Sequence, residues 1–120
     1  MISSTYINLI DSLTEKTNSG NSLWNKTAIK NQYKLILNNG MIVLTYNNNI
    51  GGMYMELEIY NNVGQKIDSV RASMDNNPAD YTYLYNLYKK IYEIKEIKTN
   101  EQINKFISEI RSSDKIGKEE

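Results

Sequence analysis

The sequence predicts an α+β domain: a four-stranded antiparallel β-meander with helices, one N-terminal and two C-terminal, packed on one face. Three observations predict it. Residues 53–60, MYMELEIY, alternate strictly between apolar and polar side chains, as in a strand with one buried face. Residues 33–46, YKLILNNGMIVLTY, hold two β-prone runs around Asn39-Gly40, a pair that favours a two-residue hairpin turn. Apolar residues at three-and-four spacing near both ends predict the helices.

The first helix is expected over residues 2–16, with one of the two serines at its start as the N-cap. A second helix opens at Asn77-Pro78, which supplies a cap and a proline suited to the first turn. A third opens at Thr99, which forms a capping-box pattern with Gln102. Trp24, in the polar stretch before the sheet, is expected to anchor the core.

The turns predict the register of the sheet. If Asn39-Gly40 is the loop, three inward-facing pairs follow. They are Leu37 with Ile42, Leu35 with Leu44, and Tyr33 with Tyr46. A three-residue turn with Gly64 in the left-handed conformation would set Ile67 opposite Ile59.

Composition narrows the function. The chain has ten tyrosines, one phenylalanine, no cysteine and no histidine. Zinc sites, Ser-His-Asp triads and Cys-His dyads are therefore excluded, and neither a metal nor a cofactor is expected. Tyrosine offers a flat apolar ring with a polar tip, which suits stacking and hydrogen bonding to a bound molecule. The composition favours a binding protein over an enzyme, which would have to use Asp, Glu, Tyr or Lys.

Charge and hydropathy bear on partners and location. Lysine plus arginine equal aspartate plus glutamate at 14 each, so no net positive field attracts nucleic acid. The first residues lack the pattern of a signal peptide, and no apolar run approaches a membrane span. A cytoplasmic protein without membrane contact is expected. We assign residues 1–112 to a single domain and residues 113–120 to a flexible tail.

The helix after Pro78 carries two stripes about 100° apart. One is aliphatic, with Leu84, Leu87, Ile91 and Ile94, and the other contains Tyr81, Tyr85, Tyr88 and Tyr92. The aliphatic stripe is expected to face the sheet, because it can be buried without partners for hydroxyl groups. The tyrosine stripe then either packs against other elements as a second edge of the core or lines a ligand or protein contact.

The outer face of the sheet is a second candidate surface. Ile36, Met41 and Val43 gather at the first hairpin, and such an apolar patch often marks an oligomer interface. The outward carboxylates Glu56, Glu58 and Asp68 are interpreted as a solvated face, not as a metal site. A homodimer or larger homo-oligomer is expected.

Several positions resemble small uncharacterised proteins of Firmicutes phages and mobile elements over about residues 9 to 94. They are Leu13, Thr17, Trp24, Tyr33, Asn39-Gly40, residues 57–64 (LEIYNNVG) and residues 83–88 (YLYNLY). The resemblance implies a non-enzymatic accessory protein of a mobile element. Some small phage proteins counter bacterial immunity by sequestering nucleotide-derived signals. No binding residue transfers by position.

Together these observations favour sequestration of a small nucleotide-like ligand. Tyr85, Tyr88 and Tyr92 would stack on the base, with Arg71 or Lys89 near phosphate. The alternative is a protein-contact module, such as an inhibitor or immunity protein, that covers a bacterial protein with its tyrosine-rich helix or outer sheet face.

Overall fold

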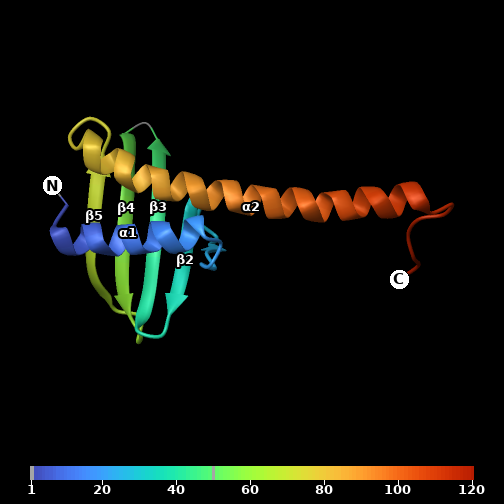
Figure 1. Ribbon diagram of the computed structural model, residues 1–120, viewed down its shortest axis with the longest axis horizontal. Helices are drawn as coiled ribbons and strands as arrows, with labels where there is room; N and C mark the ends of the chain where they lie inside the picture. Colours follow the sequence, from blue (N-terminus) through green and yellow to red (C-terminus); the bar gives the residue numbers. More distant parts are fainter. Residues whose placement is uncertain (1, 50) are drawn as a thin grey trace.

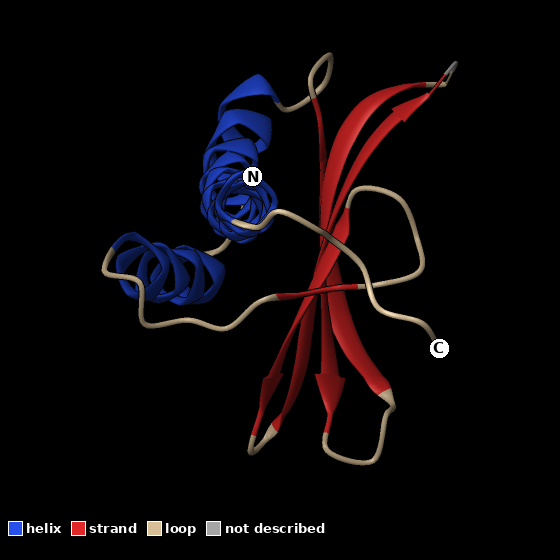
Figure 2. Ribbon diagram, turned by 90° about the vertical axis from the view of Figure 1, so that its right-hand side faces the viewer, coloured by secondary structure: helices blue, strands red, loops and turns tan. Residues whose placement is uncertain are grey.

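A computed structural model describes residues 2–49 and 51–120 and has two layers, a five-stranded sheet and two helices on one of its faces (Figures 1 and 2). The elements in chain order are α1 (Ser4–Asn18), β1 (Asn25–Lys26), β2 (Gln32–Leu37), β3 (Gly40–Asn49), β4 (Gly52–Asn61), β5 (Lys66–Ser73) and α2 (Pro78–Ser112). The strands lie in the order β1-β2-β3-β4-β5, and every neighbouring pair is antiparallel. The predicted α+β class and antiparallel meander are confirmed. The strand count of four is wrong, because the two residues of β1 pair with the edge of β2.

Helix α1 begins two residues later than expected, with Ser3 as its N-cap. The Ser3 hydroxyl accepts a hydrogen bond from the backbone N–H of Tyr6 at 3.4 Å. Trp24 is buried, and its indole N–H donates to the hydroxyl of Thr17 at the end of α1 over 3.2 Å. That bond satisfies the one polar atom of the ring, so Trp24 can join α1 to the start of the sheet inside the core.

The first hairpin turns one residue earlier than predicted. Leu37 pairs with Gly40 and Tyr33 with Leu44, so the loop is Asn38-Asn39. The predicted partners were therefore wrong by two residues, although each side chain keeps its face because the period of a strand is two. A two-residue turn of type I′ on Asn39-Gly40 would require a positive φ at Asn39. Among the described residues other than glycine, only Asn31 has one, so this turn is not formed. Gly40 is instead a strand residue, paired on both sides.

The second hairpin contains a β-bulge. Gly64 has φ 84°, which confirms the left-handed turn residue, but Ile59 pairs with Asp68 rather than with Ile67. The extra residue rotates Asp68 to the helix side of the sheet, where its carboxylate accepts a hydrogen bond of 2.8 Å from the Tyr6 hydroxyl. The predictions that Ile67 faces Ile59 and that Asp68 points outward were therefore wrong.

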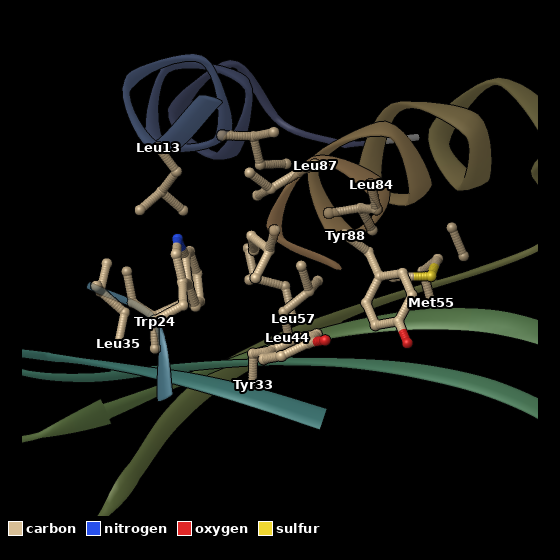
Figure 3. Packing of buried hydrophobic residues seen from close by; sticks show 14 of the residues in the cluster. Leu13, Trp24, Tyr33, Leu35, Leu44, Met55, Leu57, Leu84, Leu87 and Tyr88 are labelled. Atoms are coloured by element: carbon tan, nitrogen blue, oxygen red, sulfur yellow. The ribbon is translucent and has the colours of Figure 1, made fainter. Parts of the chain in front are cut away.

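The core lies between the sheet and the two helices (Figure 3). Its fully buried residues include Leu44 and Leu57 from the sheet, Leu84 and Leu87 from α2, and Ile10 from α1. The aliphatic stripe of α2 thus faces the sheet, as predicted. Burial of each such side chain contributes about 1.5 to 3 kcal/mol.

A single helix, α2, replaces the two C-terminal helices that were predicted. Thr99 lies inside this helix, and its hydroxyl donates a hydrogen bond of 3.0 Å to the carbonyl of Lys95. Threonine can bond backward in this way within a helix, so the capping-box pattern marks no helix start here. Beyond the sheet α2 continues as a projecting rod (Figure 1), and the molecule measures 60 × 33 × 28 Å. No helix within the described residues is long and apolar enough to cross a membrane.

Candidate functional site

The tyrosine stripe of α2 packs on two tyrosines of the sheet. The ring centroid of Tyr88 lies 5.6 Å from that of Tyr33 and 5.4 Å from that of Tyr46. Tyr46 also makes an edge contact with Tyr85 at 5.5 Å, and Tyr85 stacks on Tyr81 at 5.8 Å. These distances are typical of favourable aromatic pairs. Tyr81, Tyr85 and Tyr88 are therefore brought together as a second edge of the core.

Burial limits what these rings can bind. Tyr88 is 7% exposed, and its hydroxyl donates to the side-chain oxygen of Asn31 at 3.2 Å. Burial, helped by the neighbouring tyrosines, raises the pKa of Tyr88 to about 12. Burial likewise raises the pKa of Tyr81 to about 12. Both hydroxyls stay protonated over the physiological range, and little of either ring is accessible to a ligand.

Tyr92 is the accessible member of the stripe, at 48% exposure. It lines a hollow of about 290 Å³, the Tyr92 hollow, together with Lys26, Tyr33, Lys95, Glu96, Thr99 and Asn100. On its other side Tyr92 borders a smaller hollow of about 200 Å³, which brings together four of the expected ligand-binding residues, Tyr85, Tyr88, Lys89 and Tyr92. Hydrogen bonding to Glu96 raises the pKa of Tyr92, so its hydroxyl also stays protonated.

Two lysines give the Tyr92 hollow its positive side. Lys95 is half-buried, and burial together with the neighbouring Lys98 lowers its pKa. Across residues 2–49 and 51–120 no carboxylate lies within ion-pair distance of Lys95 or Lys26. The hollow thus combines two aromatic rings with two cations and one carboxylate, Glu96, and it can receive an aromatic or an anionic group.

Arg71 is not brought to this site. It lies on the outer face of the sheet, where its guanidinium contacts the Glu56 carboxylate at 3.2 Å and stacks over the Tyr54 ring at 4.2 Å. The helices cover the opposite face (Figure 2). Of the two cations expected near a phosphate, only Lys89 lies beside the tyrosine stripe.

The three residues expected at an oligomer interface differ in access. Ile36 is 63% exposed and Met41 is half-buried, but Val43 is 6% exposed and buried beneath its neighbours on the sheet. Beside them an ion pair of 3.1 Å joins Lys66 to Glu58. The described residues include no group of three or more side chains arranged to hold a metal ion.

A further surface is the C-terminal arm, residues 96–112 of α2. Every residue of the arm is exposed. One face of it carries Ile103, Phe106, Ile107 and Ile110. Their spacing was visible in the sequence, but whether anything covers them depended on the direction of α2.

The structure also contains a larger apolar groove that the sequence did not predict. It encloses about 650 Å³ between α1 and the first hairpin, and it is lined mainly by leucine and isoleucine side chains. Leu9 and Leu13 form its α1 side, and Leu35 and Ile42 form its sheet side. These residues belong to the core faces of α1 and the sheet, but α1 crosses the strands and the end of the first hairpin extends beyond it (Figure 1).

Comparison with protein-family models, with curated proteins and with solved structures finds no match to this chain. The resemblance to phage and mobile-element proteins therefore stays an expectation from sequence.

Proposed function

We propose that this protein is a protein-contact module, and that the C-terminal arm is the surface that binds another chain. The observation that carries the proposal is the exposure of the arm. Its apolar face contains Phe106 at 64% exposure and three isoleucines, on a helix that touches no other described element there. A contiguous exposed apolar surface of this kind is typical of interaction sites.

The composition of the arm supports a bound state. Its opposite face carries Lys98, Glu101 and Lys105, so the arm is amphipathic although it has no core beneath it. It also contains Thr99, Asn100 and other residues of modest helix propensity. A helical segment of this length is only marginally stable in water without packing. Contact with a partner would supply that packing, in the manner of an amphipathic helix laid against a groove or a second helix.

Photo-crosslinking in the producing cell tests the proposal. A benzoylphenylalanine replacing Phe106 would point along the apolar face, and one replacing Ile97 is the matched control. Ile97 is as exposed as Phe106 but lies on the flank of the arm, about 120° from Ile103. We expect protein adducts from position 106 and few from position 97. Absence of adducts at both positions would refute a protein-contact role for the arm.

A second candidate function is supported by the Tyr92 hollow. A small nucleotide-like ligand, such as a signal of bacterial immunity, would stack on the exposed ring of Tyr92 and direct its phosphate to Lys26 and Lys95. This keeps the predicted role of Tyr92. Arg71, on the opposite face of the sheet, and the buried Tyr88 do not contribute to this nucleotide site.

Calorimetric titration with mononucleotides and cyclic dinucleotides tests the second candidate. Tyr92→Ala should weaken binding by about 1 to 3 kcal/mol, the range for a lost stacking contact. Tyr92→Phe keeps the ring and should bind almost as well as the wild type. Lack of heat from any nucleotide at millimolar concentration would remove this candidate and leave the protein-contact role untouched.

A further inference from the structure

We propose that the partner of the C-terminal arm is a second copy of this chain. In this dimer two α2 helices pair antiparallel about a two-fold axis near residue 101, and Phe106 of each copy enters the Tyr92 hollow of the other. The inference rests on the protein-contact role proposed above and names the partner. It follows from three features of α2: one continuous face, a symmetric spacing along that face, and complementary charges.

The Tyr92 hollow and the apolar face of the arm form one continuous stripe. The helical residues of the hollow include Tyr92, Glu96 and Thr99, and the arm continues with Ile103, Phe106 and Ile110. Their spacing alternates between four and three residues, which keeps all six on one side of a helix. A helix laid along the arm therefore also runs over the hollow.

The stripe has an apolar half and a concave half. Ile103, Phe106 and Ile110 protrude from the exposed arm, whereas Tyr92 and Thr99 lie beside the body and border the hollow. A second copy in the antiparallel direction sets one half against the other. The resulting layers pair Tyr92 with Ile110, Glu96 with Phe106, and Thr99 with Ile103, each pair symmetric about residue 101.

Charge favours the same register. In an antiparallel pair about residue 101, Lys95 of one copy lies beside Glu109 of the other at the flank of the apolar seam. Lys95 is half-buried and has no carboxylate within ion-pair distance in its own chain among the described residues, while Glu109 is exposed. Each dimer contains this contact twice. Glu96 lies on the seam and keeps Tyr92 as its hydrogen-bond partner.

A two-fold arrangement also uses both arms and both Tyr92 hollows. Because the interface is isologous, both arms and both hollows are covered at once, and the assembly closes as a dimer. The two helices overlap from Tyr92 to Ile110, a length of about 27 Å. Each body then lies at the far end of the other copy's arm, so the sheets do not compete for the same space along α2.

Light scattering after size exclusion tests the dimer. The wild type should elute with twice the chain mass of 13.9 kDa. Phe106→Glu should give a folded monomer, whereas Ile97→Glu, a matched change on the flank of the arm, should stay dimeric. Circular dichroism shows whether each variant is folded. A wild type that is monomeric at about 100 µM, or a Phe106→Glu variant that dimerises normally, would overturn the proposal.

Charge reversal tests the register. Lys95→Glu and Glu109→Lys should each weaken dimerisation by about tenfold or more, and the double variant should recover most of the loss. If the arm instead docks in the leucine-lined groove beside α1 of another copy, the double variant would be no better than the singles. That outcome would refute the antiparallel pairing.

Spin labels test the direction. The chain has no native cysteine, so Gln102→Cys and Arg111→Cys each place one label per copy. Antiparallel pairing brings the two labels at 102 close together and separates those at 111 by about 30 Å along the axis. Short distances at both positions would indicate a parallel pair and overturn the proposal.

The crosslinking experiment distinguishes the protein-contact role of the arm from the identity of its partner as a second copy. Adducts at position 106 with a different protein, combined with a monomeric purified chain, would keep the protein-contact role and reject the second copy. Adducts between two copies support both.

Discussion

At Gly40 of β3 the backbone of β4 comes too close to admit a side chain. Gly40 pairs with Leu37 and with Asn61, has φ 154°, and a Cβ built on it would overlap the carbonyl oxygen of Tyr60. The overlapping atom belongs to the backbone, so no rotamer change can relieve it. Glycine is therefore required by the close approach of β4, and its φ adds a backbone strain that any other residue would carry.

Gly40→Ala should therefore lower the free energy of unfolding by about 2 kcal/mol or more. Gly20→Ala is the matched control. Gly20 also has a positive φ, but nothing lies within 4 Å of its Cβ position, so only the cost of backbone strain, about 1 kcal/mol, is expected. Denaturant titration of the two variants gives the comparison, and equal losses would refute the steric explanation.

Tyr88 and Tyr92 share a stripe but differ in burial, and substitution should separate them. Tyr88→Ala should cost about 3 to 5 kcal/mol of stability, as for other large aromatic core residues. Leu87→Ala should cost about 2 to 5 kcal/mol, whereas Tyr92→Ala should cost much less because half of its side chain is in water. Thermal melts of the three variants measure this. A Tyr88→Ala variant as stable as Tyr92→Ala would contradict the packing role.

At the scale of elements, helix α1 is joined to β5 by the Tyr6–Asp68 hydrogen bond of 2.8 Å. The bond lowers the pKa of Asp68 from its ordinary value of 3.8. The pKa of Tyr6 is raised from 10.0 to about 12, by burial first and then by the hydrogen bond to Asp68. Because β5 is an edge strand, this contact holds α1 over the outer part of the sheet.

The pH dependence of stability should report this contact in acid, through Asp68, and in alkali, through Tyr6. A lowered carboxyl pKa contributes stability above pH 3.8 that is lost as the pH falls through the folded value. A raised tyrosine pKa contributes stability below pH 10.0 that is lost as the pH rises through about 12. Tyr6→Phe should therefore be less stable than the wild type near neutral pH. The difference should shrink in acid and in strong alkali, and a difference constant with pH would contradict the assignment.

At the scale of the whole molecule, the protein divides into a packed body and an arm that contributes no buried residue. Among the described residues, the last buried side chain of α2 is Ile91, and everything from residue 96 onward is exposed. Folding of the body is therefore expected not to depend on the arm, whereas the proposed self-association would.

Deletion of residues 99–120 should leave a folded monomer. Its melting temperature should be independent of protein concentration, whereas that of the full chain should rise with concentration, because association stabilises the folded state by mass action. Phe106→Glu should behave like the deletion. Scanning calorimetry at protein concentrations about 30-fold apart measures the effect. A full chain whose melting temperature is independent of concentration would contradict self-association.

The sequence by itself determined the α+β class, the faces of β2, β3 and β4, and the inward stripe of α2. Alternation in residues 53–60 and the spacing of Leu84, Leu87 and Ile91 depend on periods that are local properties of a strand or helix. Burial of Trp24 followed from its size. Each of these inferences needed only neighbouring residues.

The tertiary structure decided the strand partners, the contacts of the tyrosines and the length of α2. Each of these depends on which distant part of the chain packs against a residue, which local spacing does not specify. A period of two sets the face of Leu35 but not its partner, so the hairpin register shifted by two without changing the core. A helical wheel gives the angle of Tyr88 but not the presence of Tyr33 and Tyr46 against it. Thr99 can cap a new helix or bond backward within an existing one, and only the path of α2 beyond the sheet selects the second. That path leaves Phe106 in solvent, since the sheet ends before the helix does.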